Sequence, residues 1–295
     1  MSESRGRWVT ASFIIGSILA GGNAVAVRFS NRELPPLWGA GLRFALAAVI
    51  LVAMMAVLRL PFARGRALAG AALYGALSFG GAFAFAYYAL LHIHAGLGQT
   101  LLALVPLATL ILAVLQGQER LRPAAVAGIA LAVAGVAVIS GASFEGSVPV
   151  LALLATFGAV LCFAEAAVLA RRLPPVHPVT LNAVGMLTGA VLLILGSMVT
   201  GEAMTIPQRA TTWAALAYLV PVGSVIVFLL YIYVIRQWSA SRAAYAFVII
   251  PVVTVLLSAW LDDEPIRAGL ILGGLLVLAG VYVGALRPAR KHQPA

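Results

Sequence analysis

The sequence predicts an all-α membrane protein with ten transmembrane helices, arranged as two inverted repeats of five helices. Three observations support this prediction. The 295-residue chain is 63% hydrophobic and 9% charged, with a mean hydropathy of +1.06. Soluble domains carry about 25% charged residues, so a water-soluble globule is excluded. Apolar runs of nearly the length that a ~30 Å hydrocarbon core requires of a helix recur along the chain, and the second half of the sequence repeats the first.

The apolar runs divide into ten spans. In chain order they cover about residues 8–29, 36–59, 67–90, 95–116, 122–141, 147–170, 177–200, 211–235, 239–260 and 266–286. These spans occupy most of the sequence and leave little room in it for a soluble catalytic or receptor domain. The five tryptophans, Trp8, Trp38, Trp213, Trp238 and Trp260, all fall at predicted span ends. Amphipathic indole rings are typical of membrane interfaces, which supports this segmentation.

The positive charges indicate the orientation of the spans. Of the 19 Lys and Arg residues, fourteen lie in the termini or in loops on the same predicted side, four lie in the opposite loops, and Arg43 lies within a span. The four in the opposite loops are Arg28, Arg32, Arg209 and Arg267. This bias predicts that both termini are cytoplasmic. The basic residues are distributed among short loops and form no clustered face, so nucleic-acid binding is not expected.

An internal repeat relates the two halves. Residues 69–138 reappear in weakened form 145 positions later, as residues 214–283, without a gap. The matched pairs include Pro106 and Pro251, Thr109 and Thr254, Glu119 and Glu264, Arg122 and Arg267, Gly128 and Gly273, Gly135 and Gly280, Phe83 and Phe228, and Tyr88 and Tyr233. Each half, 8–141 and 147–287, has five spans, so the second half enters the membrane from the opposite face. Inverted repeats of this kind are common in secondary transporters, which bind substrate between the repeats.

Part of this pattern resembles a known family. The residues in the first half are Pro36, Arg43, Phe44, Pro106, Glu119, Gly128 and Gly135; those in the second are Pro178, Pro251, Glu264, Gly273 and Gly280. Together they resemble the EamA repeat of the drug/metabolite transporter superfamily, and within it the chain most resembles the bacterial aromatic amino-acid exporters. The resemblance implies a ten-helix carrier of the bacterial inner (plasma) membrane that exports amino acids or related metabolites. Gly185 departs from the pattern where a second-half counterpart of Arg43 would fall.

Aromatic residues recur at one place in both halves. Phe79, Phe83 and Tyr87 are spaced i, i+4, i+8 in the third span, so a regular α-helix would present them on one face. The repeat partner of Phe83 is Phe228, and Tyr231 lies near it in the eighth span. An aromatic cavity lined by these side chains would favour large apolar or aromatic substrates. Plain helix packing or lipid contact is the alternative.

Three polar residues within spans are also candidates. Glu165 in the sixth span could bind a substrate ammonium or couple protons, because an ionisable group inside the membrane is costly and often functional. A hydrogen bond to a neighbouring helix is equally compatible with the sequence. Asn23 in the first span could donate to and accept from an amino-acid zwitterion, or it could bridge helices. Arg43 could attract a substrate carboxylate, but a snorkelling or helix-pinning role is favoured, as the resemblance also implies.

Two prolines and three polar residues complete the candidate site. Pro106 and Pro251 interrupt hydrogen bonding in the middle of symmetry-related spans, which fits hinges for rocking and equally fits static kinks. Nearby Gln99, Thr100 and Tyr245 could supply polar lining for a cavity.

No motif indicates an enzyme or a metal protein. Cys162 is the sole cysteine, and His92 and His94 lie on a loop without carboxylate or thiolate neighbours in sequence. We therefore predict no metal site and no cofactor. The sequence has no HExxH, GxSxG or Walker lysine motif.

The predicted function is secondary export of amino acids by alternating access through a central cavity, with aromatic or large neutral amino acids and related metabolites favoured. The expected partners are a small-molecule substrate and the lipid bilayer, and a monomer or weak dimer is expected. The alternative is a nucleotide-sugar or other drug/metabolite carrier, although a nucleotide diphosphate would need several cationic contacts. An intramembrane enzyme and a channel are the less favoured classes.

Overall fold

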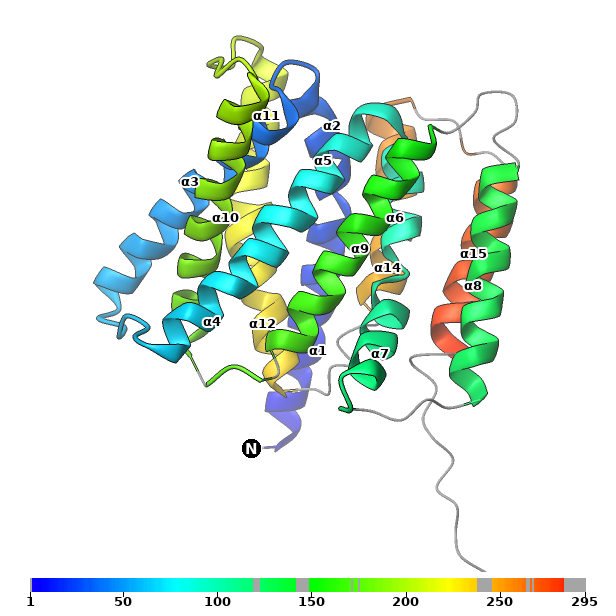
Figure 1. Ribbon diagram of the computed structural model, residues 1–295, viewed down its shortest axis with the longest axis horizontal. Coiled ribbons are helices and arrows are strands. Elements are labelled where there is room, and N and C mark those ends of the chain that lie inside the picture. The colour runs from blue at the N-terminus through cyan, green and yellow to red at the C-terminus, as the bar shows by residue number, and fades with distance from the viewer. Residues whose placement is uncertain are drawn as a thin grey trace, which may run out of the picture.

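The computed structural model describes residues 2–118, 123–141, 149–170, 172–174, 176–237, 246–263, 266 and 268–283. All regular elements within these residues are helices (Figure 1). Seven helical stretches are long and apolar enough to cross a membrane: Arg7–Asn31, Pro36–Val57, Arg66–His92, Ala95–Leu115, Val150–Ala170, Pro178–Thr200 and Ala210–Val234. Three further apolar helices are shorter and coincide, to within a residue, with parts of the fifth, ninth and tenth predicted spans. Tyr245, Glu119, Arg122, Glu264 and Arg267 lie outside the described residues, as does most of the predicted link between the halves.

The helices follow one another in a simple order. The first half contains α1 (Ser2–Gly21), α2 (Asn23–Asn31), α3 (Pro36–Val57), α4 (Arg66–Gly75), η1 (Ala76–Gly81), α5 (Ala82–His92), α6 (Ala95–Leu102), α7 (Val105–Leu115) and α8 (Pro123–Gly141). The second half contains α9 (Val150–Ala170), α10 (Pro178–Thr200), α11 (Ala210–Tyr218), η2 (Leu219–Ile226), α12 (Val227–Gln237), α14 (Ala246–Leu261) and α15 (Ala268–Val281).

The first span is broken at Gly22, where the sequence predicts one continuous helix. A Cβ atom at Gly22 would lie 2.5 Å from the Tyr218 hydroxyl oxygen, so only glycine leaves room for this tyrosine. The Tyr218 hydroxyl donates to the carbonyl oxygen of Leu19, and the Thr254 hydroxyl donates to that of Gly21 at 2.7 Å. Side chains from α11 and α14 thus bond carbonyls next to the break, as an apolar surrounding requires.

Two spans contain a π-helical segment at related positions. η1 joins α4 to α5, and η2 joins α11 to α12. Adding the repeat offset of 145 to η1 gives residues 221–226, which lie within η2. Each π-helical turn holds more residues than an α-helical turn, so side chains on either side of it no longer follow the α-helical spacing.

Helices from opposite halves of the chain pack so closely that their backbones are in contact. α10 packs along α3 and also against α4 and η1. A Cβ atom added to Gly75 would overlap the backbone of Gly185, and one added to Gly189 would lie 2.5 Å from Phe79 Cβ. This close approach is a physical reason for glycine at position 185, where the repeat would place a counterpart of Arg43. On the other side of the bundle, η2 packs against α3.

Two carboxylates tie the helix ends that lie opposite the N-terminal end of the bundle. Glu202, in the segment before α11, accepts hydrogen bonds from the backbone N–H groups of Leu37 and Trp38 at the start of α3. Glu33, in the segment before α3, accepts from the N–H groups of Gln208 and Arg209, just before and at the start of α11. Each carboxylate lies where a helix dipole favours negative charge, so each half stabilises a helix end of the other.

α8 and α15 form a pair at one edge of the molecule (Figure 1). A Cβ atom at Gly135 would lie 2.6 Å from the carbonyl oxygen of Gly273, and one at Gly280 would lie 2.5 Å from that of Gly128. The four repeat-related glycines therefore bring these two helices into backbone contact.

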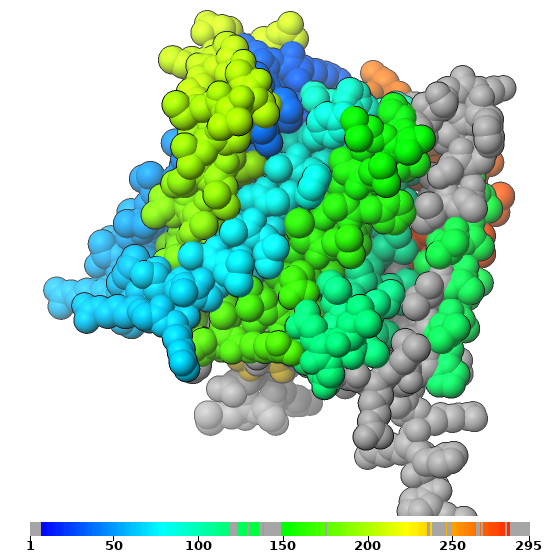
Figure 2. Space-filling model, viewed as in Figure 1, coloured from blue at the N-terminus to red at the C-terminus, as the bar shows by residue number. Residues whose placement is uncertain are grey.

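The outer surface is apolar over much of its area. Figure 2 shows one face, formed by side chains of α10, the α4–α5 segment, α9 and α7 lying side by side. Large apolar residues are exposed on several helices, among them Val49, Phe85, Leu154 and Leu195. Exposed apolar surface of this extent suits contact with lipid and is unusual for a water-soluble monomer.

Candidate functional site: a cavity between the halves

A cavity of about 630 Å³ lies among helices from both halves of the chain. Its wall is built by α1 to α7 with η1, and by α9, α10, α12 and α14. None of the described residues of α8 and α15 contributes to it. The volume lies within the range of small-molecule sites, and most of the wall is apolar. The cavity is therefore a candidate binding site for a small molecule with a large apolar part.

Aromatic side chains form one wall of the cavity. Phe83 of α5 lies 5.5 Å from the ring of Phe163 in α9 and 6.2 Å from that of Phe228 in α12, measured between centroids. Tyr87 and Tyr231 also line the cavity. Four of the predicted site residues, Phe83, Tyr87, Phe228 and Tyr231, are thus brought together, and Phe163 joins them. Rings at these separations offer edges and faces for an apolar or aromatic ligand.

Phe79 lies behind this wall. Its side chain is fully buried, and its ring lies 5.2 Å from Phe44 and 4.9 Å from Phe228. Ser78 lines the cavity where the regular spacing predicts Phe79. The π-helical turn of η1 separates Ser78 from Phe83 by five residues, which moves Phe79 off the face shared by Phe83 and Tyr87.

A buried polar cluster forms another part of the wall. Arg43, about two turns from the start of α3, is fully buried. Its Nε donates to Ser224 Oγ at 2.8 Å, its Nη2 to the Gly223 carbonyl oxygen at 3.0 Å, and its Nη1 to the Tyr87 hydroxyl oxygen at 3.5 Å. Its guanidinium carbon also lies 5.0 Å from the Phe44 ring centroid and 5.1 Å from that of Phe83. Among the described residues that line the cavity, Arg43 is the one charged side chain.

Asn23 lies beside this cluster and lines the cavity. Its Nδ2 donates to the Gly223 carbonyl oxygen at 3.2 Å, the same oxygen that accepts from Arg43. Its Oδ1 is buried and has no hydrogen-bond partner. A Cβ atom at Gly223 would overlap Asn23 Oδ1, so glycine is needed there for the asparagine to approach η2.

The predicted lining from the fourth span is also at the cavity. Gln99 and Pro106 line it, on either side of a break at Ala103 and Leu104 that separates α6 from α7. Pro106 is the second residue of α7, where a missing N–H has little cost. Pro251, its repeat partner, lies inside the uninterrupted α14 and is buried away from the cavity wall. The two prolines therefore have different surroundings, and their predicted hinge role remains a prediction.

Glu165 lies outside the cavity wall, although its helix α9 contributes to it. Both of its carboxylate oxygens accept from Gln116 Nε2, at 3.0 and 2.7 Å. The Gln116 carbonyl oxygen in turn accepts from Arg172 Nη2 at 3.2 Å. This arrangement is the hydrogen bond between helices that the sequence analysis gave as the alternative to substrate binding. The last predicted site residue, Tyr245, lies outside the described residues.

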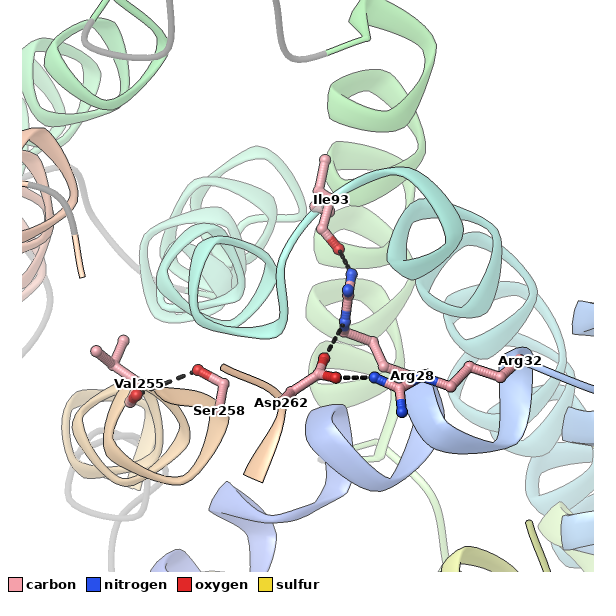
Figure 3. A network of polar contacts seen from close by, with 6 residues as sticks. All are labelled: Arg28, Arg32, Ile93, Val255, Ser258 and Asp262. Atoms are coloured by element: carbon pink, nitrogen blue, oxygen red, sulfur yellow. Dashed lines mark hydrogen bonds and ion pairs between the residues drawn. The ribbon is translucent and has the colours of Figure 1, made fainter. Parts of the chain in front are cut away.

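A cluster of ion pairs lies at the end of the bundle opposite the N-terminus. Arg28 Nε donates to Asp262 Oδ2 at 2.8 Å and Arg28 Nη1 to the Ile93 carbonyl oxygen at 2.7 Å, while Arg32 pairs with Asp262 Oδ1. The Asp262 side chain is 1% exposed. Figure 3 shows Asp262, beyond the end of α14, beside Arg28 of α2 and Arg32, which directly follows α2. We call Arg28, Arg32, Asp262 and the Ile93 carbonyl the Asp262 cluster.

The Asp262 cluster lies next to the cavity. Val27 and Leu90, which line the cavity, precede Arg28 and Ile93 closely in the chain. At the other end, the wall includes Ser12 near the start of α1 and Leu173 and Val176 between α9 and α10. Sequence reasoning did not single out this cluster. The available signal was the presence of Arg28, Arg32 and a carboxylate in loops predicted to face the same side of the membrane.

Comparisons with known proteins identify similar chains. A model described as the EamA-like transporter family matches residues 7–141 and 150–285. The uncharacterized inner membrane transporter YedA of Escherichia coli is 31% identical over 272 residues, which cover 90% of this chain and 87% of that protein. A "probable terminal-alkyne amino-acid exporter" of Streptantibioticus cattleyicolor is 32% identical over 248 residues, covering 82% and 81%.

Two further matches cover nearly the whole chain. A "probable amino-acid metabolite efflux pump" of Salmonella typhimurium is 26% identical over 279 residues, covering 90% of this chain and 91% of that protein. A solved crystal structure, titled only as that of a protein, has a similar fold with a TM-score of 0.68 at 23% identity, covering 95% of this chain and 97% of that one.

Proposed function

The chain belongs to the EamA-like transporter family, and on this basis we propose that it is a secondary carrier that exports amino acids by alternating access. The family and the relatives' names point to a transporter rather than an enzyme. Two relatives carry names that refer to amino-acid efflux or export. The proposal for this chain is export of amino acids, aromatic or large neutral ones above all, together with related metabolites.

The observation that carries the proposal is the cavity between the two halves, whose wall runs from Ser12 and Val176 near one end of the bundle to Val27 and Leu90, which lie near the Asp262 cluster in the chain. A carrier of the alternating-access type needs a solute site that is exposed to one side at a time. The aromatic wall formed by Phe83, Phe163 and Phe228 suits a large apolar side chain. A nucleotide sugar is less suited, because its diphosphate would meet a single charged side chain, Arg43, among the described residues of the wall.

The proposed architecture is ten transmembrane helices in two inverted repeats, residues 8–141 and 147–287. The two family-model matches, the 145-residue sequence repeat and the related positions of η1 and η2 support it. We propose that the protein lies in the inner membrane, because its relative YedA is named as an inner membrane transporter, and that both termini are in the cytoplasm. We propose that the cavity is accessible from the cytoplasm in this state, with the Asp262 cluster on the outer side. A monomer or weak dimer is proposed.

Transport by purified protein in liposomes tests the proposed function. Vesicles loaded with unlabelled tryptophan should accumulate labelled tryptophan transiently, because a carrier exchanges solute across the membrane. The initial rate should saturate with external tryptophan. A rate that rises linearly with concentration would indicate a channel, and chemical alteration of the tryptophan would indicate an enzyme. Absence of counterflow for tryptophan, phenylalanine, leucine and threonine would contradict the proposal.

The inverted arrangement has its own test. Single cysteines placed at Gly65 and Gln237, in a Cys162→Ser background, should react with an impermeant maleimide from the same side of the membrane. The two positions lie in repeat-equivalent loops that the charge bias assigns to the cytoplasm. Labelling of the two positions from different sides would contradict the proposed topology.

A further inference from the structure

Arg43 is a buried cation whose hydrogen-bond partners are all neutral. Its side chain is fully buried, and it bonds to a serine hydroxyl, a tyrosine hydroxyl and a backbone carbonyl. Among the described residues, no carboxylate forms an ion pair with it. A guanidinium removed from water is costly unless it is paired with an anion, because dipoles alone compensate its charge incompletely. The arrangement therefore lacks the counter-ion that a buried arginine normally has.

The guanidinium of Arg43 also has N–H groups that donate no hydrogen bond to a described residue. A guanidinium carries five N–H donors, and the three bonds above use one each on Nε, Nη1 and Nη2. One N–H on each terminal nitrogen therefore remains, the number that a carboxylate takes in a bidentate pair. The bond to the Tyr87 hydroxyl is the longest, at 3.5 Å, and is the easiest for an anion to replace. Beside the guanidinium, the Oδ1 atom of Asn23 is buried and has no hydrogen-bond partner in the part of the chain that the structure describes.

We propose that the missing counter-ion is the carboxylate of the transported substrate, so that Arg43 selects cargo by its carboxylate. This inference rests on the proposed export of amino acids and narrows it. The carboxylate would bond to Nη1 and Nη2 of Arg43 beside Tyr87, and the apolar part of the substrate would lie against Phe83 and Phe228. Phe83 and Tyr87 lie against the guanidinium, so their movement would expose it to a substrate in the cavity.

The substrate ammonium group has a weaker role in this arrangement. The described wall of the cavity contains no Asp or Glu, and Glu165 lies outside it. An ammonium group would meet neutral acceptors such as Asn23 Oδ1. Because the site is cationic, a carboxylate without an ammonium group should bind nearly as well as the amino acid, whereas an amine without a carboxylate should be rejected. The substrate class is therefore carboxylates with a large apolar or aromatic body.

Competition against tryptophan counterflow with the unmodified protein tests whether a carboxylate without an amine binds better than an amine without a carboxylate. Tryptamine keeps the indole ring and the amine but lacks the carboxylate, and 3-indolepropionate keeps the ring and the carboxylate but lacks the amine. We expect 3-indolepropionate to inhibit at a concentration within about threefold of tryptophan, and tryptamine to need at least about tenfold more. Equal inhibition by tryptamine, or none by 3-indolepropionate, would overturn the inference.

Substitutions of Arg43 add a second measurement. Arg43→Gln removes the charge and should bring the inhibition constants of tryptamine and 3-indolepropionate close together, and Arg43→Lys should keep their order with weaker binding. Ser224→Ala is the matched control, because it removes one partner of Arg43 and leaves its charge, so the order should persist. If the Arg43→Gln protein transports tryptophan and is still inhibited more strongly by 3-indolepropionate than by tryptamine, Arg43 only joins α3 to η2. If that variant does not fold, the competition series decides by itself.

The two proposals fail in different ways. Absence of counterflow for every amino acid contradicts amino-acid export. Counterflow of tryptophan combined with strong competition by tryptamine leaves amino-acid export in place and contradicts only the role of Arg43.

Discussion

Single residues determine what the cavity presents to a substrate. Along the third span, Tyr74, Ser78, Phe83 and Tyr87 line the cavity at spacings of four, five and four residues. The sequence predicts the face of Phe83 and Tyr87, because these two lie in the regular helix α5. Regular α-helical spacing would put Phe79 on this face as well, because the composition gives no recognisable signal of the π-helical turn that displaces it. The role of Arg43 is equally hard to predict from the sequence, because its partners Gly223 and Ser224 on η2 lie 180 and 181 residues away.

Phe83→Ala should reduce tryptophan transport more than threonine transport. The ring of Phe83 contacts Phe44, Phe163 and Phe228, and its loss removes the part of the wall that a large side chain touches. We expect a decrease of about tenfold or more in kcat/KM for tryptophan, equivalent to one stacking or burial contact. Phe85→Ala is the matched control from the same helix, because Phe85 is 43% exposed and does not line the cavity. An equal loss for both amino acids would indicate that Phe83 only supports the fold.

At the scale of elements, the sequence predicts where the spans run better than how they are interrupted. All ten predicted spans contain a helix in the described residues. The break at Gly22 and the π-helical segments were not predicted, because each depends on a partner from another helix. Tyr218 and Thr254 bond the carbonyls at the break, and Gly185 and Gly189 admit η1 against α10. Interruptions of this kind are determined by tertiary contacts, which local periodicity does not encode.

Gly75→Ala should destabilise the protein through the contact between α4 and α10. The added methyl group would overlap the backbone of Gly185, which cannot move aside as a flexible side chain can. Overpacking of this kind costs about 1–3 kcal/mol, which for a protein of this size lowers the melting temperature by several degrees. The measurement is thermal unfolding in detergent.

Gly196→Ala on α10 is the control for that substitution. A Cβ atom there would meet only the Leu37 side chain, at 3.4 Å, so its stability should change little or rise with the better helix propensity of alanine. Equal melting temperatures for Gly75→Ala and the unmodified protein would contradict the close packing of α4 on α10.

At the scale of the whole molecule, the structure of each end of the bundle depends on which loops contact one another there. The sequence places Arg28, Arg32 and the residues after α14 on one predicted side, but it does not show that they contact one another. In the structure, the Asp262 cluster joins the end of the first span to α14 and to the turn between α5 and α6. In the proposed mechanism these contacts must break before the cavity opens at this end, so the cluster should control access from that side.

Asp262→Asn should therefore expose the cavity to reagents from the outer side. The Asp262 carboxylate is 1% exposed and pairs with both Arg28 and Arg32. Loss of a fully buried ion pair costs about 3–5 kcal/mol, and the partial exposure of the two arginines reduces that cost here. A shift of only about 1.4 kcal/mol between the closed and open states changes their ratio tenfold. A cysteine at Val27, which lines the cavity beside the cluster, should then react about tenfold faster with an impermeant maleimide added outside, in a Cys162→Ser background.

Glu33→Gln is the control that separates opening of the cavity from general loosening of this end. Glu33 also lies at this end and accepts hydrogen bonds from the N–H groups of Gln208 and Arg209, but it lies outside the cavity wall and, among the described residues, forms no hydrogen bond or ion pair with the Asp262 cluster. Its substitution should leave the labelling rate of the Val27→Cys protein unchanged. A cysteine at Ser12, near the other end of the cavity, should react more slowly from the cytoplasmic side in the Asp262→Asn protein, because a carrier that opens outward closes inward. Faster labelling at both positions would instead describe a bundle that has lost its packing, and an unchanged rate at Val27→Cys would show that the Asp262 cluster does not hold the cavity closed.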